Sequence, residues 1–134
     1  MREEPGETEP PSYFDPAIVE EGYRIVNAGG LNRALLMPRF MQVLMRTRWY
    51  ERKLFLESLI AGEDVRAVRD FGDLGLATDT AMYLVGPKFR CAVYRFLLEQ
   101  HRHFQGPILE ITDPDAIDEL GPAGALEIFR HRPA

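Results

Sequence analysis

The fold of this chain is decided by one long stretch, residues 38–61, which reads PRFMQVLMRTRWYERKLFLESLIA. Pro38 suits the first position of a helix, and no other proline or glycine occurs before Gly62, which predicts the end of the helix. At 1.5 Å per residue, this helix would be about 36 Å long, roughly the width of a small domain. We therefore expect the rest of the chain to pack around one long helix.

On a helical wheel, residues 38–61 carry two apolar faces. The wider face is expected to dock on the core and comprises Phe40, Met41, Val43, Leu44, Tyr50, Leu54, Phe55 and Leu59. The opposite stripe comprises Met45, Trp49, Leu56 and Ile60, with Arg46, Arg52 and Lys53 beside it. A helix that is apolar on two sides is either wrapped centrally by its own domain or shared with another chain. Because tryptophan, methionine and arginine are enriched at protein interfaces, this stripe with its basic rim is the candidate interface.

The rest of the sequence predicts a mainly α-helical bundle of four to five helices with a minor C-terminal two-stranded β element. Asp15 and Pro16 begin a helix that ends at Gly29 and Gly30. Further helical segments are expected at residues 31–36, 64–70, 79–85, 87–104 and 114–120, the last ending at Gly121 and Pro122. The strands are expected at residues 108–112 and 124–130. A strand at 79–85 and a helix at 124–130 remain open alternatives.

Charge divides the chain into acidic ends and a basic middle. The net charge is −6 over residues 1–22, +4 over residues 33–69 and −4 over residues 105–134, within a total of −5. Residues 1–14 are rich in proline and glutamate and are expected to be a disordered tail, before a single helical domain at 15–134 whose residues 105–134 form a small α/β extension. We favour acidic ends that neutralise the middle over a middle that faces an acidic partner.

Composition excludes several classes of protein. The single cysteine, Cys91, forms no internal disulfide, which fits a reducing compartment, and we expect a cytoplasmic protein. No run approaches the roughly 18 apolar residues of a membrane span, and the acidic N-terminus does not have the pattern of a secretory signal.

Residues that carry chemistry are sparse, so we expect no cofactor and no metal, and a role that is not enzymatic. The serines, Ser12 and Ser58, do not lie in a nucleophile turn. On a helix, His101 and His103 diverge by about 200°, too far to chelate one ion. Cys91 is expected to be a buried apolar residue, and the acidic residues at 113–119 fit a helix N-terminus better than a calcium loop.

The sequence thus favours a protein–protein interaction or assembly module, such as an adaptor, that acts through its long helix and forms a homo-oligomer. The alternative is a nucleic-acid-binding regulator that uses Arg39, Arg46, Arg48 and Arg52. Against the alternative, these arginines spread around the helix and the whole protein is acidic. A small apolar ligand held between helices is a third possibility.

Overall fold

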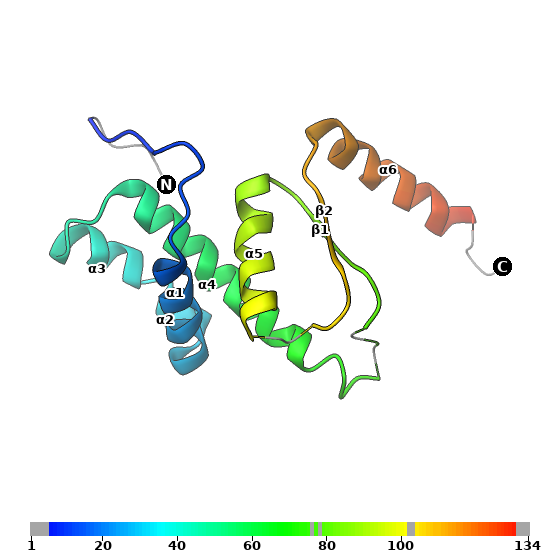
Figure 1. The fold of residues 1–134 in the computed structure, drawn as a ribbon, viewed down its shortest axis with the longest axis horizontal. Coiled ribbons are helices and arrows are strands. Elements are labelled where there is room, and N and C mark those ends of the chain that lie inside the picture. The colour runs from blue at the N-terminus through cyan, green and yellow to red at the C-terminus, as the bar shows by residue number, and fades with distance from the viewer. Residues whose placement is uncertain (1–5, 76, 78, 102–103, 131–134) are drawn as a thin grey trace.

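The computed structural model describes residues 6–75, 77, 79–101 and 104–130 (Figure 1). In this part of the chain, five helices have eight or more residues, and a sixth is a single turn of four. In chain order, the elements are α1 (Pro16–Gly29), α2 (Leu31–Ala34), α3 (Met37–Leu44), α4 (Trp49–Arg69), β1 (Met82–Val85), α5 (Lys88–His101), β2 (Ile108–Ile111) and α6 (Pro114–Arg130). The predicted fold class, mainly helical with a minor two-stranded β element, is confirmed.

Helix α1 has the predicted boundaries and the predicted caps. The Asp15 side chain accepts a hydrogen bond from the backbone N–H of Ala17 at 2.9 Å, and Pro16 occupies the first turn. At the other end, Gly30 adopts a φ of 76°, which is strained for any residue with a Cβ, and its N–H donates to the carbonyl of Val26.

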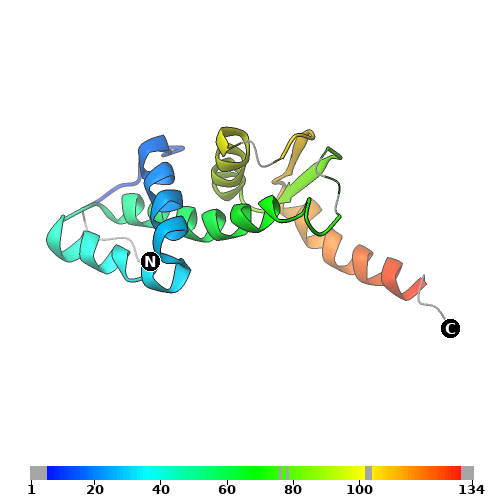
Figure 2. The same ribbon diagram turned by 90° about the horizontal axis from the view of Figure 1, so that it is seen from below.

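Helix α4 is the central element, and α1 and α5 both pack on it (Figure 2). Apolar side chains from these three helices form the centre of the core, and they are Val19, Val26, Leu54, Phe55, Leu59, Val65, Val93, Leu97 and Leu98. Of the two arrangements that the sequence left open for the long helix, α4 therefore has the first, a central helix surrounded by its own domain.

Two glycines let α1 and α4 approach closely. A Cβ on Gly22 would lie 2.7 Å from the Cβ of Ser58, and one on Gly62 would lie 2.8 Å from Cγ1 of Val26. The prediction that Gly62 ends the helix is therefore wrong. Gly62 lies inside α4, where the close contact with α1 leaves no room for a side chain.

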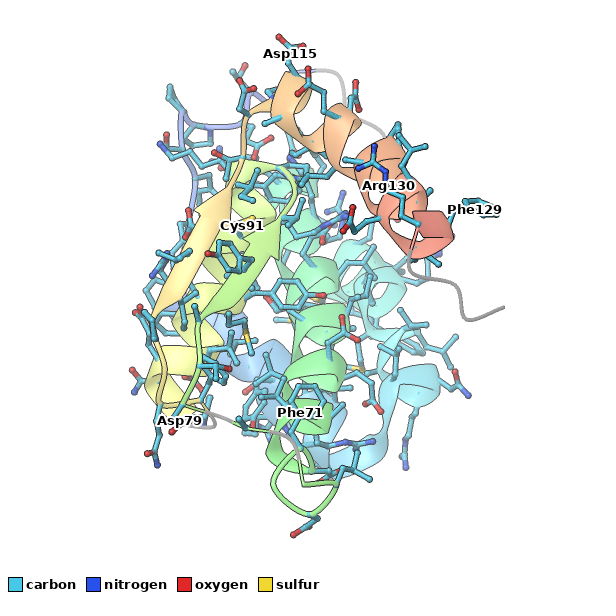
Figure 3. All side chains as sticks on the ribbon, turned by 90° about the vertical axis from the view of Figure 1, so that its right-hand side faces the viewer. Phe71, Asp79, Cys91, Asp115, Phe129 and Arg130 are labelled. Atoms are coloured by element: carbon cyan, nitrogen blue, oxygen red, sulfur yellow. The ribbon has the colours of Figure 1, made fainter. Side chains whose placement is uncertain are left out.

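The strands form a parallel pair in a β1–α5–β2 unit, with register from Met82↔Ile108 to Val85↔Ile111. Met82, Leu84 and Ile108 pack against the core on the side of α5. The alternation of strand side chains places Tyr83, Val85, Leu109 and Ile111 on the outer face of the sheet. In Figure 3 the two strands lie in front of α5.

The single long helix predicted at 38–61 is wrong. The chain forms α3 and α4, separated by Met45–Arg48, and Arg46 has a φ of +51°. The break changes the direction and phase of the helix, so the wide apolar face does not act as one surface. Its part in α4 (Tyr50, Leu54, Phe55 and Leu59) is buried, whereas Phe40, Val43 and Leu44 of α3 are exposed.

The other corrections concern the second half of the chain. The helix expected at 64–70 is the end of α4, and the expected helix at 79–85 contains strand β1, so the open strand alternative is right there. The expected strand at 124–130 belongs to α6, which runs through Gly121 and Pro122 without ending, so the open helical alternative is right there. The local pattern could not decide β1, because that strand is defined by pairing with a strand 26 residues later in the chain.

Candidate interaction surface

Helix α3 presents an apolar face to solvent. The exposed residues, which we call the α3 surface, are Leu35, Leu36, Phe40, Val43, Leu44 and Met45. Phe40 is 52% exposed and Leu44 is 73% exposed. Residues at positions 36, 40, 43 and 44 share one side of a helix, so they form a continuous strip. A strip of this kind on a small protein marks a binding site more often than isolated exposed leucines do.

The side of α3 next to this strip borders a groove. Met37, Met41 and Met45 follow one another by one helical turn and face α1 and α4 across a cavity of about 370 Å³, with Met45 at the edge that the groove shares with the α3 surface. Ile18 and Ile25 of α1 and Phe55 of α4 complete its apolar wall. Methionine side chains are flexible and polarizable, so a groove of this composition can adapt to the side chains of a partner. We call it the α3 groove.

The α3 side of this region is basic, whereas the side of the groove formed by α1 and α4 contains two carboxylates, Glu21, which pairs with Arg24, and Glu51, which accepts from the Arg48 N–H. Residues 31–48 contain Arg33, Arg39, Arg46 and Arg48 and no acidic residue, and all four arginines are exposed. The structure shows no ion pair for them with another described residue; Arg39 donates a hydrogen bond to Gln42, and the Arg48 guanidinium lies 5.9 Å from the centre of the Tyr50 ring. The α3 surface is therefore apolar with a basic border.

The turn between α3 and α4 is fixed by polar contacts. The N–H of Arg48 donates to the Glu51 carboxylate at 2.7 Å, which satisfies one free group at the start of α4. The Arg52 guanidinium is buried and donates to the carbonyl of Thr47. These contacts hold α3 at its angle to α4 and so shape the groove.

The stripe predicted as the interface is divided by this turn. Met45 and Arg46 lie with the α3 surface, and Met45 is 68% exposed. Leu56 is half-buried and Ile60 is partly exposed, both within α4. Arg52 is buried, so it does not form a solvent-exposed rim. The role of these residues in association stays a prediction.

Trp49 and Lys53, the other members of the predicted interface, lie beneath the acidic N-terminal segment. Trp49 is only 5% exposed; its backbone N–H donates to the Glu7 carboxylate at 2.9 Å, and its ring N–H donates to the Glu7 carbonyl at 3.2 Å. Lys53 forms an ion pair with Glu9 at 3.1 Å. The N-terminal acidic end therefore lies on the basic middle, as we favoured, whereas Glu110 of the C-terminal end pairs with Arg95, outside residues 33–69. Disorder of residues 1–14 stays a prediction, and residues 1–5 lie outside the described part.

Aromatic contacts hold the next residues of this segment against the body. The rings of Tyr13 and Tyr50 lie 4.6 Å apart, and those of Phe14 and Phe96 lie 5.7 Å apart. Burial, with the nearby Glu51 carboxylate as a smaller cause, raises the pKa of Tyr13 to about 12. Tyr13 is therefore neutral in the folded protein well above the pH at which an exposed tyrosine ionises.

The residues of the nucleic-acid alternative are also divided. Arg39, Arg46 and Arg48 are exposed near α3, whereas the buried Arg52 cannot reach a phosphate. The remaining three, together with Arg33, form the basic border of an apolar surface. The aromatic residue nearest in sequence, Trp49, is covered by Glu7, so it is not presented for base stacking.

The structure gives the reactive side chains structural roles. Cys91 is buried, its thiol donates to the carbonyl of Gly86 at 3.5 Å, and burial raises its pKa. The Nε2 atom of His101 lies 3.2 Å from the Glu20 carboxylate, and its ring stacks on Tyr23; His103 lies outside the described residues. Within the described ranges, no group of three His, Cys, Asp or Glu side chains could hold a metal ion.

The sequence signal for the α3 surface was present but was assigned to the core. Residues 35–45 carry apolar side chains on nearly every side of the helix, with Arg39 and Gln42 as the polar exceptions after Pro38. A helix that only covers a core needs one apolar stripe, so the excess indicates a second contact. The helical wheel did not show this excess, because it treated α3 and α4 as one continuous helix.

Comparison with known proteins gives no relative for this chain: no family model, no curated protein and no solved structure matches it. None of the helices in the described part of the chain is long and apolar enough to cross a membrane.

Proposed function

We propose that this chain is a non-enzymatic protein–protein interaction or assembly module that binds a helix of its partner at the α3 surface and groove. The observation that supports the proposal is the exposed apolar strip on α3 beside a groove lined by three methionines. An amphipathic helix laid along such a groove would bury its apolar face on Met37, Met41 and Ile25. Of the residues predicted from the sequence, Met45 belongs to this surface and Arg46 to its basic border.

Charge and burial favour a protein over a nucleic acid as the partner. A surface that binds phosphates would place its arginines at the centre of the contact, whereas Arg39 and Arg46 border a strip that is apolar at its centre. This arrangement, with apolar residues inside and charged residues around them, is typical of protein interfaces. A cytoplasmic adaptor role fits a chain with a single buried cysteine, and is part of the proposal.

The test is site-specific cross-linking of the full chain in cells of its natural host. A photoreactive amino acid replaces Phe40 on the α3 surface, and in a matched control it replaces Leu74, which is 72% exposed in the turn after α4. We expect a cross-linked protein from position 40 and none from position 74. Adding Val43→Asp beside the photoreactive position 40 should abolish the product, because a buried unpaired charge is costly at an apolar interface.

Each other result counts against the proposal. A product at position 40 that nuclease removes would favour the nucleic-acid alternative. Equal products at positions 40 and 74 would show that the cross-link reports exposure and not a site. Absence of any product, with the circular-dichroism spectrum unchanged, would exclude α3 as a binding surface under these conditions.

A further inference from the structure

Helix α6 is an arm that extends from the body of the molecule. None of its residues is buried, and Leu120, Leu126, Ile128 and Phe129 are 43–73% exposed. Figures 1 and 2 show α6 projecting beyond the other helices, and in Figure 3 Phe129 and Arg130 lie at its far end. Helices in proteins are stabilised mainly by packing of one face, so a helix that also contains a proline needs a surface to pack on.

One side of α6 is suited to close packing. Ile117, Leu120, Gly124 and Ile128 follow at intervals of three and four residues and so lie along one strip, with Gly121 beside them. A Cβ at Gly121 or Gly124 would meet no atom within 4 Å in the described chain, so no contact there requires glycine. Glycines on the strip would instead allow the arm to approach another backbone closely.

The charge of α6 complements that of the α3 surface. The arm contains four acidic residues and one basic residue, Arg130, which gives a net charge of −3. Residues 31–48 carry a charge of +4 and no acidic residue. Apolar strips with opposite charged borders both attract and orient each other, which raises the rate and specificity of association.

The arm cannot reach the α3 groove of its own chain. α3 and α6 lie at opposite ends of the molecule in Figures 1 and 2. Only Thr112 and Asp113 connect β2 to α6, and two extended residues span about 7 Å. The complementary arm must therefore come from another molecule.

The outer face of the sheet is the other apolar surface that could receive the arm, and its charge does not fit. The strands and their flanks, residues 79–87 and 105–113, contain no lysine or arginine; Glu110 lies on the inner face and pairs with Arg95, and Asp79 and Asp113 flank the strands. The outer face therefore offers no cation to an arm with a charge of −3, which makes it a poorer match than the α3 surface.

We propose that α6 of one copy docks on the α3 surface and groove of a second copy, and the reverse, to form a dimer with two-fold symmetry. Each copy has one arm and one groove, so reciprocal exchange closes the assembly without leaving either surface open. This inference rests on the proposed function, because it names the helix that the groove binds.

The test measures the solution mass of the purified full-length chain by light scattering over a series of concentrations. The arm variant is Leu120→Asp with Ile128→Asp, the surface variant is Phe40→Asp with Val43→Asp, and the control is Leu74→Asp. These residues are exposed in the single chain, so circular dichroism should show intact folds. We expect dimers for the wild type and the control, and a dissociation constant raised by more than about 100-fold for both double variants.

Mixing the two double variants in equal amounts is the decisive step. The arm variant retains an intact groove and the surface variant retains an intact arm, so the mixture should form a heterodimer although each variant alone is monomeric. A surface variant that remains dimeric would show that α6 pairs with something other than the α3 surface. An arm variant that remains dimeric would show that the α3 surfaces pair with each other. Either result, or a mixture without heterodimer, overturns the exchange.

The proposed function and this inference can fail separately. If the purified wild type is monomeric while position 40 cross-links a different protein in cells, the inference fails and the proposed function stands. If the purified wild type is monomeric and position 40 gives no product, both fail.

Discussion

Helices α1 and α6 differ more in their surroundings than in their sequences. Both are amphipathic, with 14 and 17 residues, and both begin with a proline in the first turn. α1 buries Val19, Gly22 and Val26 against the core, whereas α6 buries no residue. The same kind of helix is thus a structural element at one end of the chain and an arm at the other.

The glycines of the two helices make the difference specific. Gly22 lies where a side chain would collide with α4, so the packing of this chain explains it. Gly124 lies where a side chain would meet nothing. Glycine is costly inside a helix; in α1 the packing of the chain requires it, whereas in α6 no contact in the described chain does.

The largest expected effect is the difference in unfolding free energy between truncating a buried leucine and truncating an exposed one. Leu59 of α4 is fully buried in the core and Leu126 of α6 is 57% exposed, on the side of the arm away from the proposed contact strip. Leu59→Ala should lower the free energy of unfolding by about 2–5 kcal/mol, because it leaves a cavity. Leu126→Ala should change it by less than about 0.5 kcal/mol. Urea denaturation followed by circular dichroism measures both, and similar losses would contradict the view of α6 as an arm.

The next effect concerns alanine at the glycines. Gly22→Ala and Gly62→Ala should each cost about 1–3 kcal/mol of unfolding free energy, since the new Cβ would be under 3 Å from Ser58 or Val26. Gly121→Ala in α6 should leave the unfolding midpoint of the body unchanged, because nothing lies within 4 Å of the new methyl group. Thermal melts of the three variants provide the measurement. A stable Gly62→Ala protein would mean that α1 and α4 can separate without loss.

Alkaline pH should weaken the packed body. Tyr13 has a pKa of about 12 in the folded chain against 10.0 when exposed, and burial, aided by a hydrogen bond to Asp64, also raises the pKa of Tyr94. The folded state therefore holds protons that the unfolded state loses above pH 10.0, so stability is full below that pH and decreases as the pH rises toward about 12. Denaturation at several pH values should show this decrease, and it should be smaller in Tyr13→Phe and in Tyr94→Phe. An unchanged slope in both variants would assign the decrease to other groups.

The sequence predicted the elements whose signals are local. Asp15, Pro16 and Gly30 define α1 because caps depend on a few adjacent residues. Gly62 did not predict the end of α4, because this glycine is needed for the close contact with α1. The residues of that contact are far from Gly62 in the sequence. β1 was ambiguous for the same reason, because its partner is β2.

The candidate site was predicted only in part. Met45 and Arg46 lie at the α3 surface, but Phe40, Val43 and Leu44 were assigned to the core. The error follows from the break at residues 45–48, which no proline or glycine marks and across which Arg52 contacts the carbonyl of Thr47. A helical wheel drawn for residues 35–45 alone would show apolar side chains on nearly every side of α3.

The smallest expected effect comes from comparing one ion pair in the N-terminal segment with one in the arm. Both regions are acidic, but the segment's Glu9 pairs with the body, whereas Glu127 pairs within α6. Glu9→Gln removes the ion pair with Lys53, whose side chain is 32% exposed. It should lower the free energy of unfolding by about 0.2–1 kcal/mol, less at high salt, because partly exposed pairs are screened. Glu127→Gln in α6, whose ion pair with Arg130 at 3.6 Å is more exposed, is the matched control and should change less. Trp49 is the only tryptophan, so its emission reports the segment directly. A shift to longer wavelength in Glu9→Gln would show that the pair holds Glu7 over the ring, and identical emission with unchanged stability would show that the Glu7 contacts hold the segment without it.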